Sequence, residues 1–423
     1  MPNYHIWTIG CQMNKAESER LASCFEGLGY QATDTAIEAD LIVLNSCVVR
    51  QNAENRVINK LNNLKQLKKA KPGMVIAVTG CLVNSEIDRL SKSFPHVDHF
   101  FKPGASPPWL EKTGTEPSLP RHPSPGVYVP IIQGCNNFCS YCIVPYRRGR
   151  ERSRTIAEIT GEVRELVHRG AKEVTLLGQN VDSYGHDLPG KPDLADLLAE
   201  LNTIRGLARL RFLTNHPKDM SPRLIEAIAK LDKVCEQISL PVQSGSDDIL
   251  KAMRRGYTVA QYRQLITQIR RRIPGVALST DVIVGFPSES DSQFQQTVDL
   301  LSEIKFDTVH VAAYSPRTGT VAAREFEDNI PTPEKRERLN RIEQLQEKMA
   351  TEINARLQGK MIEILVESQT KGKWQGRSRT GKLVFFSSIN NHLGQLVKIR
   401  IDRTSPWSLQ GEIKANTNRE GNE

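Results

Sequence analysis

Long apolar runs are absent from this 423-residue sequence. No segment approaches the roughly 18 consecutive apolar residues that a transmembrane helix needs. The first ten residues also lack the charged stretch and the apolar core of a secretory signal. We therefore expect a cytoplasmic protein that does not associate with a membrane.

The composition excludes both a disordered chain and a single small module. Hydrophobic residues make up 39% of the chain, and 57 Lys and Arg residues against 48 Asp and Glu residues give a net charge of +9. Domains mostly span about 100 to 200 residues, so this length predicts two or three of them. The positive charge is local, because residues 354–423 hold twelve Lys and Arg residues but only six Asp and Glu residues.

Strand-like and helix-like segments alternate in the first part of the chain, which we delimit as residues 2–117. Strands are predicted near 4–9, 40–44 and 74–79, and helices over 16–28 and 53–69. This alternation predicts a parallel sheet with covering helices, and we take the domain to be flavodoxin-like. The proline-rich stretch 103–125 is interpreted as a linker.

The same alternation resumes over residues 121–353, which form the second predicted domain. Strand-like segments occur at 127–132, 173–177, 208–213, 237–240, 277–284 and 308–313. Six such units predict a partial TIM-type barrel, in which ligands gather at the carboxyl ends of the strands. The third part, residues 354–417, has short strand-like runs between glycine-containing turns and predicts a small antiparallel β-barrel.

Three of the eight cysteines form a CxxxCxxC loop directly after the first strand of the second domain. They are Cys135, Cys139 and Cys142. Cysteines in a reducing cytosol that cluster in this way are more typical of metal ligands than of disulfides. Three thiolates on one short loop can hold an iron-sulfur cube and leave one iron open to a further ligand. A zinc site with a remote fourth ligand is the alternative, although zinc signatures usually pair two CxxC halves.

Three further cysteines, Cys11, Cys47 and Cys81, each follow a strand-like run in the first domain. The carboxyl ends of parallel strands meet at one edge of a sheet, so these thiols can converge on a second cluster. The alternative is that they are isolated core residues. Cys24 and Cys235 lie in different contexts, and we expect both to be packing residues.

The loop CNNFCSYC resembles the signature of the radical S-adenosylmethionine (SAM) superfamily. Together with the N-terminal cysteines and the basic C-terminal block, it makes the whole chain resemble the methylthiotransferase family, whose members end in a TRAM domain. The resemblance implies a 4Fe-4S cluster on Cys135, Cys139 and Cys142 that binds SAM at its open iron and cleaves it to a radical. It also implies a second 4Fe-4S cluster, on Cys11, Cys47 and Cys81, that supplies the sulfur.

Four segments resemble the tRNA-modifying branch of this family, namely 10–14, 44–50, 80–81 and 142–154. In particular, Gln12-Met13-Asn14 follows the first cysteine where the branch acting on ribosomal protein S12 typically has Pro-Lys-Asn. The implied activity is transfer of a methylthio group to C2 of N6-isopentenyladenosine next to the tRNA anticodon. Threonylcarbamoyl-adenosine in tRNA and ribosomal protein S12 remain alternative substrates, and a non-enzymatic iron-sulfur RNA-binding protein is a further alternative.

Polar and small residues at predicted strand ends of the second domain are candidates for SAM contacts. They are Gly178, Gln179, Asn180, Gln243, Ser244 and Asp281, to which we add Tyr141 beside the last loop cysteine. His216 and His310 are interpreted as structural, because a radical mechanism needs no strong general base. No catalytic residue is therefore predicted beyond the cluster ligands.

Basic residues occur at two places where RNA could bind. Five arginines follow the cysteine loop, at positions 147, 148, 150, 152 and 154, and could clamp phosphates. The third domain adds Lys371, Lys373, Trp374, Arg377, Arg379 and Lys382. We expect a monomer whose partners are tRNA, an external one-electron reductant and an external sulfur source.

Overall fold

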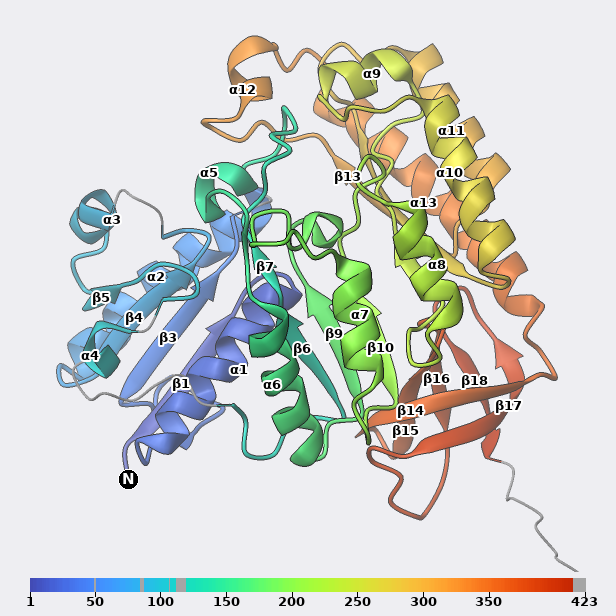
Figure 1. The fold of residues 1–423 in the computed structure, drawn as a ribbon. Coiled ribbons are helices and arrows are strands. Elements are labelled where there is room, and N and C mark those ends of the chain that lie inside the picture. Colours follow the sequence, from blue (N-terminus) through green and yellow to red (C-terminus); the bar gives the residue numbers. More distant parts are fainter. Residues whose placement is uncertain (49–50, 84–86, 106, 112–118, 414–423) are drawn as a thin grey trace, which may run out of the picture.

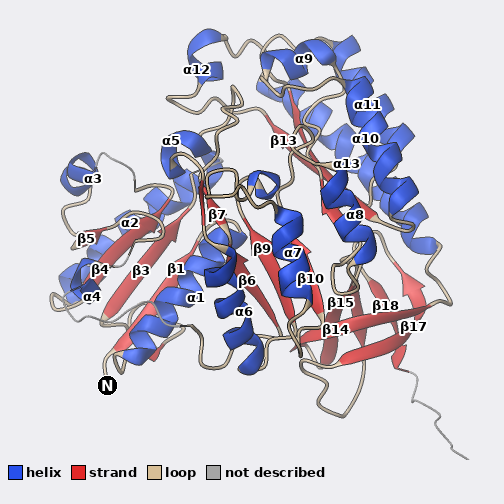
Figure 2. Ribbon diagram, viewed as in Figure 1, coloured by secondary structure: helices blue, strands red, loops and turns tan. Residues whose placement is uncertain are grey.

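The computed structural model describes residues 1–48, 51–83, 87–105, 107–111 and 119–413. Val49 and Arg50 of the 44–50 segment lie outside these residues, as do the predicted domain ends at 117 and 417. Three sheet systems follow one another along the chain, with helices on the outside of the first two and a small barrel after them (Figure 1, Figure 2). We call them the N-terminal domain, the core barrel and the C-terminal barrel.

The N-terminal domain contains a five-stranded sheet. Its strands are β1 (Asn3–Thr8), β2 (Gln31–Ala32), β3 (Leu41–Ser46), β4 (Val75–Gly80) and β5 (His99–Phe100). Every pair is parallel and the order is β2-β1-β3-β4-β5. This is the flavodoxin-like order, in which ligands bind where the winding reverses, between β1 and β3. The predicted fold of this part is confirmed.

Helices α1 (Gln12–Gly27), α2 (Gln51–Ala70) and α3 (Ile87–Ser93) connect these strands. The strand β3 is buried along its whole length, as a parallel strand covered on both faces should be. Helix α1 begins four residues earlier than its hydrophobic pattern predicts. The reason is local, because the side chain of Asn14 turns back and accepts a hydrogen bond from the Cys11 amide at 3.3 Å.

The core barrel has six parallel strands, as predicted. They are β6 (Gly126–Pro130), β9 (Glu173–Leu177), β10 (Arg209–Phe212), β11 (Gln237–Ser239), β12 (Ala277–Val284) and β13 (Thr308–Ala313). They form two sheets, β10-β9-β6 and β11-β12-β13, and an isolated parallel bridge between Leu210 and Val234 lies where the two sheets meet. The barrel is therefore partial.

The outer helices of the core barrel are α6 (Ile156–His168), α7 (Leu194–Asn202), α8 (Pro222–Lys230), α10 (Val259–Arg272), α11 (Asp291–Ile304) and α13 (Thr332–Ala355). Four of them start with a reciprocal capping box, at Thr155, Asp193, Thr258 and Ser290. Short elements build the loops between them: β7 (Ile132–Gln133), α5 (Val144–Arg148), β8 (Arg152–Ser153), the 3-10 turn η1 (Val181–Ser183), α9 (Asp247–Ala252) and α12 (Val321–Glu325).

The C-terminal barrel closes in the order β14-β15-β16-β18-β17. Its strands are β14 (Met361–Thr370), β15 (Lys373–Ser378), β16 (Leu383–Phe386), β17 (Leu396–Thr404) and β18 (Leu409–Ile413). Four neighbouring pairs are antiparallel, but β16 and β18 run parallel. The prediction of an antiparallel barrel therefore needs this one correction, since a closed ring with an odd number of strands cannot alternate direction throughout.

The described part of the predicted linker is packed rather than free. Helix α4 (Pro108–Glu111) places Trp109 against the N-terminal domain. The Trp109 ring stacks on Phe25 with a centroid distance of 6.5 Å and meets Phe101 edge-on at 6.1 Å. The linker interpretation is wrong for these residues, because proline content does not reveal an aromatic anchor.

Within the described residues, no helix is long and apolar enough to cross a membrane.

Candidate metal and cofactor site

The three N-terminal thiols lie at one edge of the five-stranded sheet. Cys11 follows β1, Cys47 follows β3 and Cys81 follows β4, and these three strands are neighbours. Cys11 is exposed, whereas Cys47 and Cys81 are buried. Cys11 and Cys81 are close enough for the charge of one thiolate to raise the pKa of the other. The group therefore opens to solvent on the side of Cys11.

A buried polar network fixes the chain around these thiols. Asn14 donates from Nδ2 to Asn45 Oδ1 at 2.7 Å, and Asn45 donates from Nδ2 to the Asn14 carbonyl at 2.8 Å. At Gly80, where φ is +89°, a Cβ atom would lie 2.3 Å from the Ser46 carbonyl oxygen. This close approach allows the Cys81 amide to donate to Ser46 at 2.7 Å. The loops after β1, β3 and β4 thus hold one another in place.

Arg148, which ends helix α5 of the core barrel, reaches this thiol group. Its Nε atom lies 3.3 Å from Cys81 Sγ, and its Nη1 atom donates to Glu17 Oε1 at 2.8 Å. Burial raises the pKa of the Cys81 thiol, and the Arg148 cation opposes that effect. Arg148 is itself buried, so its predicted role as a phosphate contact is wrong. Sequence spacing could not show that one arginine of the run points into the neighbouring domain.

The central loop is anchored to the barrel on several sides. At Gly134, where φ is +85°, a Cβ atom would lie 2.1 Å from the Arg150 carbonyl oxygen. The Gly134 amide donates to Gln179 Oε1 at 2.6 Å. Ser140 donates from its amide to Met253 and accepts at its carbonyl from Ala322 of α12. The loop cysteines are therefore held in a defined conformation.

The loop brings Cys135, Cys139 and Cys142 together. Burial raises the pKa of Cys135 to about 11 and that of Cys142 to about 12, and the neighbouring thiols contribute to both shifts. Three mutually repelling thiolates in a partly buried loop need a cation to hold them in the ionised form. A metal centre supplies that charge.

The chemistry of both donor sets fits iron-sulfur clusters, which are held by cysteine thiolates. Among the residues that the structure describes, no three His, Cys, Asp or Glu side chains converge tightly enough to hold one metal ion. A cube holds its thiolates further apart than a single ion does, because each thiolate binds a different iron. Each trio of thiols supplies the ligand type of such a cube, without a fourth cysteine in the set.

Several of the predicted SAM contacts lie at strand ends beside the loop. Asn180 donates from Nδ2 to Asp219 at 2.7 Å, and its Oδ1 is buried without a hydrogen-bond partner among the described residues. Gln243 adopts φ of +72°, and its buried Oε1 has no partner in the same part of the chain. Unpaired buried amide oxygens are costly, so these two are candidates for ligand contacts.

The other predicted contacts are placed differently. Gln179 already accepts the Gly134 amide, and Gly178 packs closely on Ile132. Ser244 faces Thr297 of α11 at 3.4 Å, and Asp281 is half-buried on β12. Gln179, Gly178 and Ser244 thus contact neighbouring elements of the core barrel.

Tyr141 packs against a hydrophobic cluster that includes Phe286 and Tyr314. Its hydroxyl accepts a long contact of 3.5 Å from Nη1 of Arg255. The ring is therefore held beside the loop by packing and by a buried cation.

Buried polar residues at the end of β10 were not predicted as site residues. His216 accepts at Nδ1 from the Lys218 amide at 3.2 Å, and its buried Nε2 has no partner among the described residues. Burial, followed by the nearby cations Arg255 and Lys218, lowers the pKa of His216 to about 2. The ring is therefore neutral, with its proton on Nε2. The signal in the sequence that could have identified His216 as a site residue is its position after the end of a predicted strand.

The predicted RNA-binding residues are only partly free. Trp374 is 8% exposed in the core of the C-terminal barrel, so it cannot stack on a base. Arg379 pairs with Glu236 at 2.7 Å and Lys382 pairs with Asp307 at 2.7 Å, both across the interface with the core barrel. These three predictions are corrected, because residues that look basic and exposed in sequence dock the barrel instead. Lys371, Lys373 and Arg377 are exposed.

The C-terminal barrel docks on the amino ends of the core strands. Arg209, the first residue of β10, donates to the Arg377 carbonyl and to Glu363, and Arg211 donates to the Ser378 carbonyl. The cysteine loop follows the carboxyl end of β6, and in Figure 1 α5 lies at the end of the core barrel away from β14 and β15. The exposed lysines and the thiols therefore lie at opposite ends.

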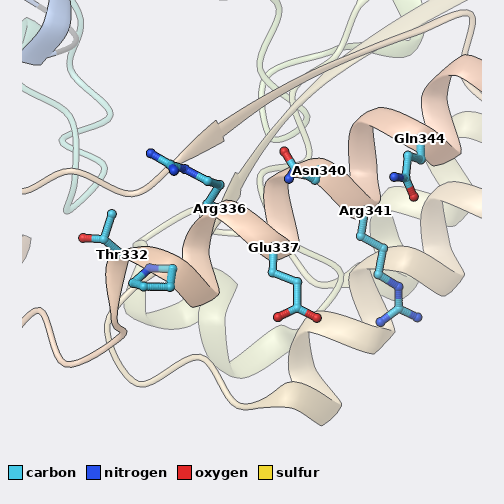
Figure 3. Close-up of a pocket in the computed structure, with 7 residues that line it drawn as sticks. Thr332, Arg336, Glu337, Asn340, Arg341 and Gln344 are labelled. Carbon is cyan, nitrogen blue, oxygen red and sulfur yellow. The ribbon is translucent and has the colours of Figure 1, made fainter.

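One cavity lies beside α1 of the N-terminal domain, and another hollow lies along α13 of the core barrel. A cavity of about 320 Å³ lies between α1 and the strands β7 and β8, and Glu17, Arg20, Cys24 and Arg152 are among its lining residues. A second hollow, of about 650 Å³, lies along α13 and is drawn in Figure 3; it is lined by Thr332, Pro333, Arg336, Glu337, Asn340, Arg341 and Gln344. The second contains neither a cysteine nor a predicted SAM contact.

Cys24 and Cys235 are buried, as expected of packing residues.

Family models match three segments of the chain. Residues 3–102 match an uncharacterized protein family, UPF0004, residues 129–301 match the Radical SAM superfamily, and residues 355–414 match the TRAM domain.

Curated relatives are similar over nearly the whole length. A tRNA-2-methylthio-N(6)-dimethylallyladenosine synthase of Dehalococcoides mccartyi strain CBDB1 is 56% identical over 98% of this chain and 99% of its own. Proteins of the same name from Chloroflexus aurantiacus and Clostridium botulinum are 51% and 44% identical, over 96% and 97% of this chain and 91% and 96% of their own.

Solved structures share the fold at low identity. The radical S-adenosylmethionine methyltransferase TsrM from Kitasatospora setae, with cobalamin and a 4Fe-4S cluster bound, aligns with a TM-score of 0.52 and 13% identity over 76% of this chain and 74% of its own. The cobalamin-dependent S-adenosylmethionine radical enzyme OxsB aligns with a TM-score of 0.51 and 12% identity over 81% and 56%.

Proposed function

The chain belongs to the family of the tRNA-2-methylthio-N(6)-dimethylallyladenosine synthases, and we propose that it catalyses the reaction for which those relatives are named. It is a radical SAM enzyme, and 4Fe-4S and SAM are the cofactors of that superfamily. The proposed reaction adds a methylthio group to C2 of N6-isopentenyladenosine next to the tRNA anticodon. The observation that carries the proposal is the pair of three-thiol groups, one in each of two adjoining domains.

Cys135, Cys139 and Cys142 would hold the cluster that supplies an electron to SAM, and Cys11, Cys47 and Cys81 would hold a second cluster that supplies sulfur. Each set has three cysteines and so leaves one iron for another ligand. Two open irons suit a reaction in which one site makes a radical and the other delivers a group.

The protein's own residues orient the central site. Gln179 and Gly134 fix the start of the cysteine loop, and Ser140 fixes its middle. The unpaired oxygens of Asn180 and Gln243 are suited to donors on SAM, such as its amino group or ribose hydroxyls. Neutral His216 offers a donor from Nε2.

The N-terminal site has a buried side and a side that is accessible to solvent. Cys47 and Cys81 lie inside, where Asn45 and Ser46 hold their strand ends, and Cys11 lies at the surface. This arrangement leaves the exposed side for the sulfur that must be replaced after each product. An external sulfur source and an external one-electron reductant are therefore part of the proposal.

tRNA is the proposed partner, and its main contacts would include the exposed Lys371 and Lys373 of the C-terminal barrel. Because these lie at the opposite end from the thiols, the bound RNA has to extend along the core barrel to reach them. A folded tRNA is long enough for such a contact, whereas a small nucleoside is not. We therefore expect a free nucleoside to be a poor substrate.

A competition between substrates tests the proposal. The reconstituted full chain is incubated with SAM, reductant and sulfide, and with tRNA carrying N6-isopentenyladenosine, tRNA carrying threonylcarbamoyl-adenosine, or ribosomal protein S12. We expect a methylthio product, detected by mass spectrometry, on the first substrate alone. A product on S12 and none on tRNA would overturn the proposal.

A further inference from the structure

We propose that Arg148 is a positioning residue that tunes the reduction potential of the cluster on Cys11, Cys47 and Cys81. The inference rests on the proposed function, because it presumes that these three thiols hold a cluster. It adds that the core barrel controls the chemistry of the N-terminal site through one guanidinium group.

Arg148 is close in sequence to the cysteines of the central loop and is in direct contact with a cysteine of the N-terminal group. It ends helix α5, which begins two residues after Cys142. From there its Nε atom lies 3.3 Å from Cys81 Sγ. A single short helix therefore connects a ligand of the central loop to a ligand of the N-terminal group.

The guanidinium is buried and mostly paired. Its side chain is 3% exposed, and Glu17 of α1 accepts from Nη1 at 2.8 Å. The remaining Nη2 is buried without a partner among the described residues. A buried cation that keeps one donor free beside a sulfur ligand is costly unless a negative group comes within reach. A cluster with its sulfides and thiolates is such a group.

Hydrogen bonds to the sulfurs and nearby positive charge are two factors that raise the potential of an iron-sulfur cluster. Both stabilise the reduced form, which carries one more negative charge. Arg148 supplies both factors at Cys81, and Glu17 opposes the charge. The structure therefore predicts opposite effects for the removal of these two charges.

Simple docking of the two domains is the competing explanation. A matched ion pair makes it testable, because Arg20 of α1 also bridges to the core barrel, at 2.6 Å from Glu162 of α6. Arg20 has no contact with a cluster cysteine among the contacts that the structure describes. Loss of Arg20 weakens docking without touching the thiols.

The test is a redox titration followed by electron paramagnetic resonance. It uses the full chain with Cys135, Cys139 and Cys142 replaced by alanine, so that only the N-terminal cluster contributes. We compare this parent with added Arg148→Gln, Glu17→Gln or Arg20→Gln. The expected midpoint shifts are negative for Arg148→Gln, positive for Glu17→Gln and absent for Arg20→Gln.

Unchanged midpoints in both Arg148→Gln and Glu17→Gln would overturn the inference, and so would equal shifts in all three variants. If the Arg148→Gln variant does not retain iron, the direction of the midpoint shift in Glu17→Gln decides whether the inference holds. In the otherwise unmodified enzyme, product formation by Arg148→Gln should fall about 10- to 100-fold. Failure of the unmodified chain to make product would sink the proposed function, yet the midpoint shifts would still be measurable.

Discussion

The Nη1 atom of Arg255 lies 3.3 Å from the Sγ atom of Cys139 in the central loop. Arg255 is buried, and its Nη2 donates to the Pro241 carbonyl at 2.9 Å while its Nε donates to the Tyr257 hydroxyl at 3.1 Å. The cation is therefore held in place by residues of the core barrel. Each thiol group thus has one buried arginine in contact with one of its sulfurs.

Replacing Arg255 by Lys should weaken the central site. Lysine keeps the charge but cannot reach Cys139, Pro241 and Tyr257 together, because it lacks the planar fork of the guanidinium. We expect SAM cleavage to 5'-deoxyadenosine to fall about 10- to 100-fold. The neighbouring Arg254→Gln is the control, since Arg254 pairs with Glu325 at the surface. Its effect on stability should stay within about 1 kcal/mol, and equal losses of cleavage in both variants would contradict this role for Arg255.

Cys47→Ala should separate the two sites. Methylthiolation is expected to vanish while SAM cleavage by the central site stays measurable. Iron content should fall from about eight to about four atoms per chain, because a cluster of this type holds four irons. Cys24→Ala is the matched control, because Cys24 lies in the apolar core beside Phe25 rather than at a strand end, and it should keep all the iron. Full product formation by Cys47→Ala would refute the second cluster.

Much of this arrangement could be predicted from sequence because it depends on strand order. Cys11, Cys47 and Cys81 each follow an apolar strand, and parallel strands bring such positions to one edge. The partners of Arg148, Arg379 and Lys382 could not be predicted in this way. Those contacts join segments more than 50 residues apart, and a basic run looks the same whether it faces solvent or another domain.

Asp182 should make the stability of the core barrel depend on pH. Burial raises the pKa of this carboxyl from 3.8 to about 7, against the hydrogen bonds from the His216 amide and from Asn215. The folded state therefore favours the protonated acid, and stability declines as pH rises from about 4 to 7. The full cost above pH 7 is about 4 kcal/mol.

Asp182→Asn removes the charge and should flatten this dependence. Asn215 has a buried Oδ1 without a partner among the described residues, so a rotated Asn215 amide could accept from the new side chain. Between pH 5 and pH 7.5 the variant should gain about 2 to 3 kcal/mol relative to the original chain. Urea unfolding of the cluster-free protein at both pH values measures this gain. A constant difference between the two proteins would argue against the raised pKa.

Replacing the exposed basic residues of the C-terminal barrel should affect RNA binding differently from replacing the docked ones. Alanine at Lys371 and Lys373 should lower the slope of log affinity for tRNA against log salt concentration by about 1 for each lysine. Arg379→Ala should leave the slope unchanged and instead destabilise the interface, because Arg379 pairs with Glu236. Salt titrations of tRNA binding by each variant provide the measurement. A loss of slope in Arg379→Ala alone would reverse the assignment.

The aromatic residues mark a second limit of sequence-based prediction. Trp374 stands among basic residues, yet its ring fills the barrel core and its Nε1 donates to the Ser388 carbonyl at 3.3 Å. Alternation along β15 already places Trp374 on the inner face, with Lys373 on the outer face. The alternation of side chains along the strand therefore predicts the position of Trp374 better than the basic composition of the segment does.

Mass spectrometry of tRNA nucleosides tests the central claim most directly. tRNA is compared from cells that carry the gene, from cells that lack it, and from deleted cells that express the Cys47→Ala chain. We predict 2-methylthio-N6-isopentenyladenosine in the first sample, and its unmethylthiolated precursor in the other two. Unchanged 2-methylthio-adenosines after deletion, together with loss of the methylthio mass from ribosomal protein S12, would contradict the account.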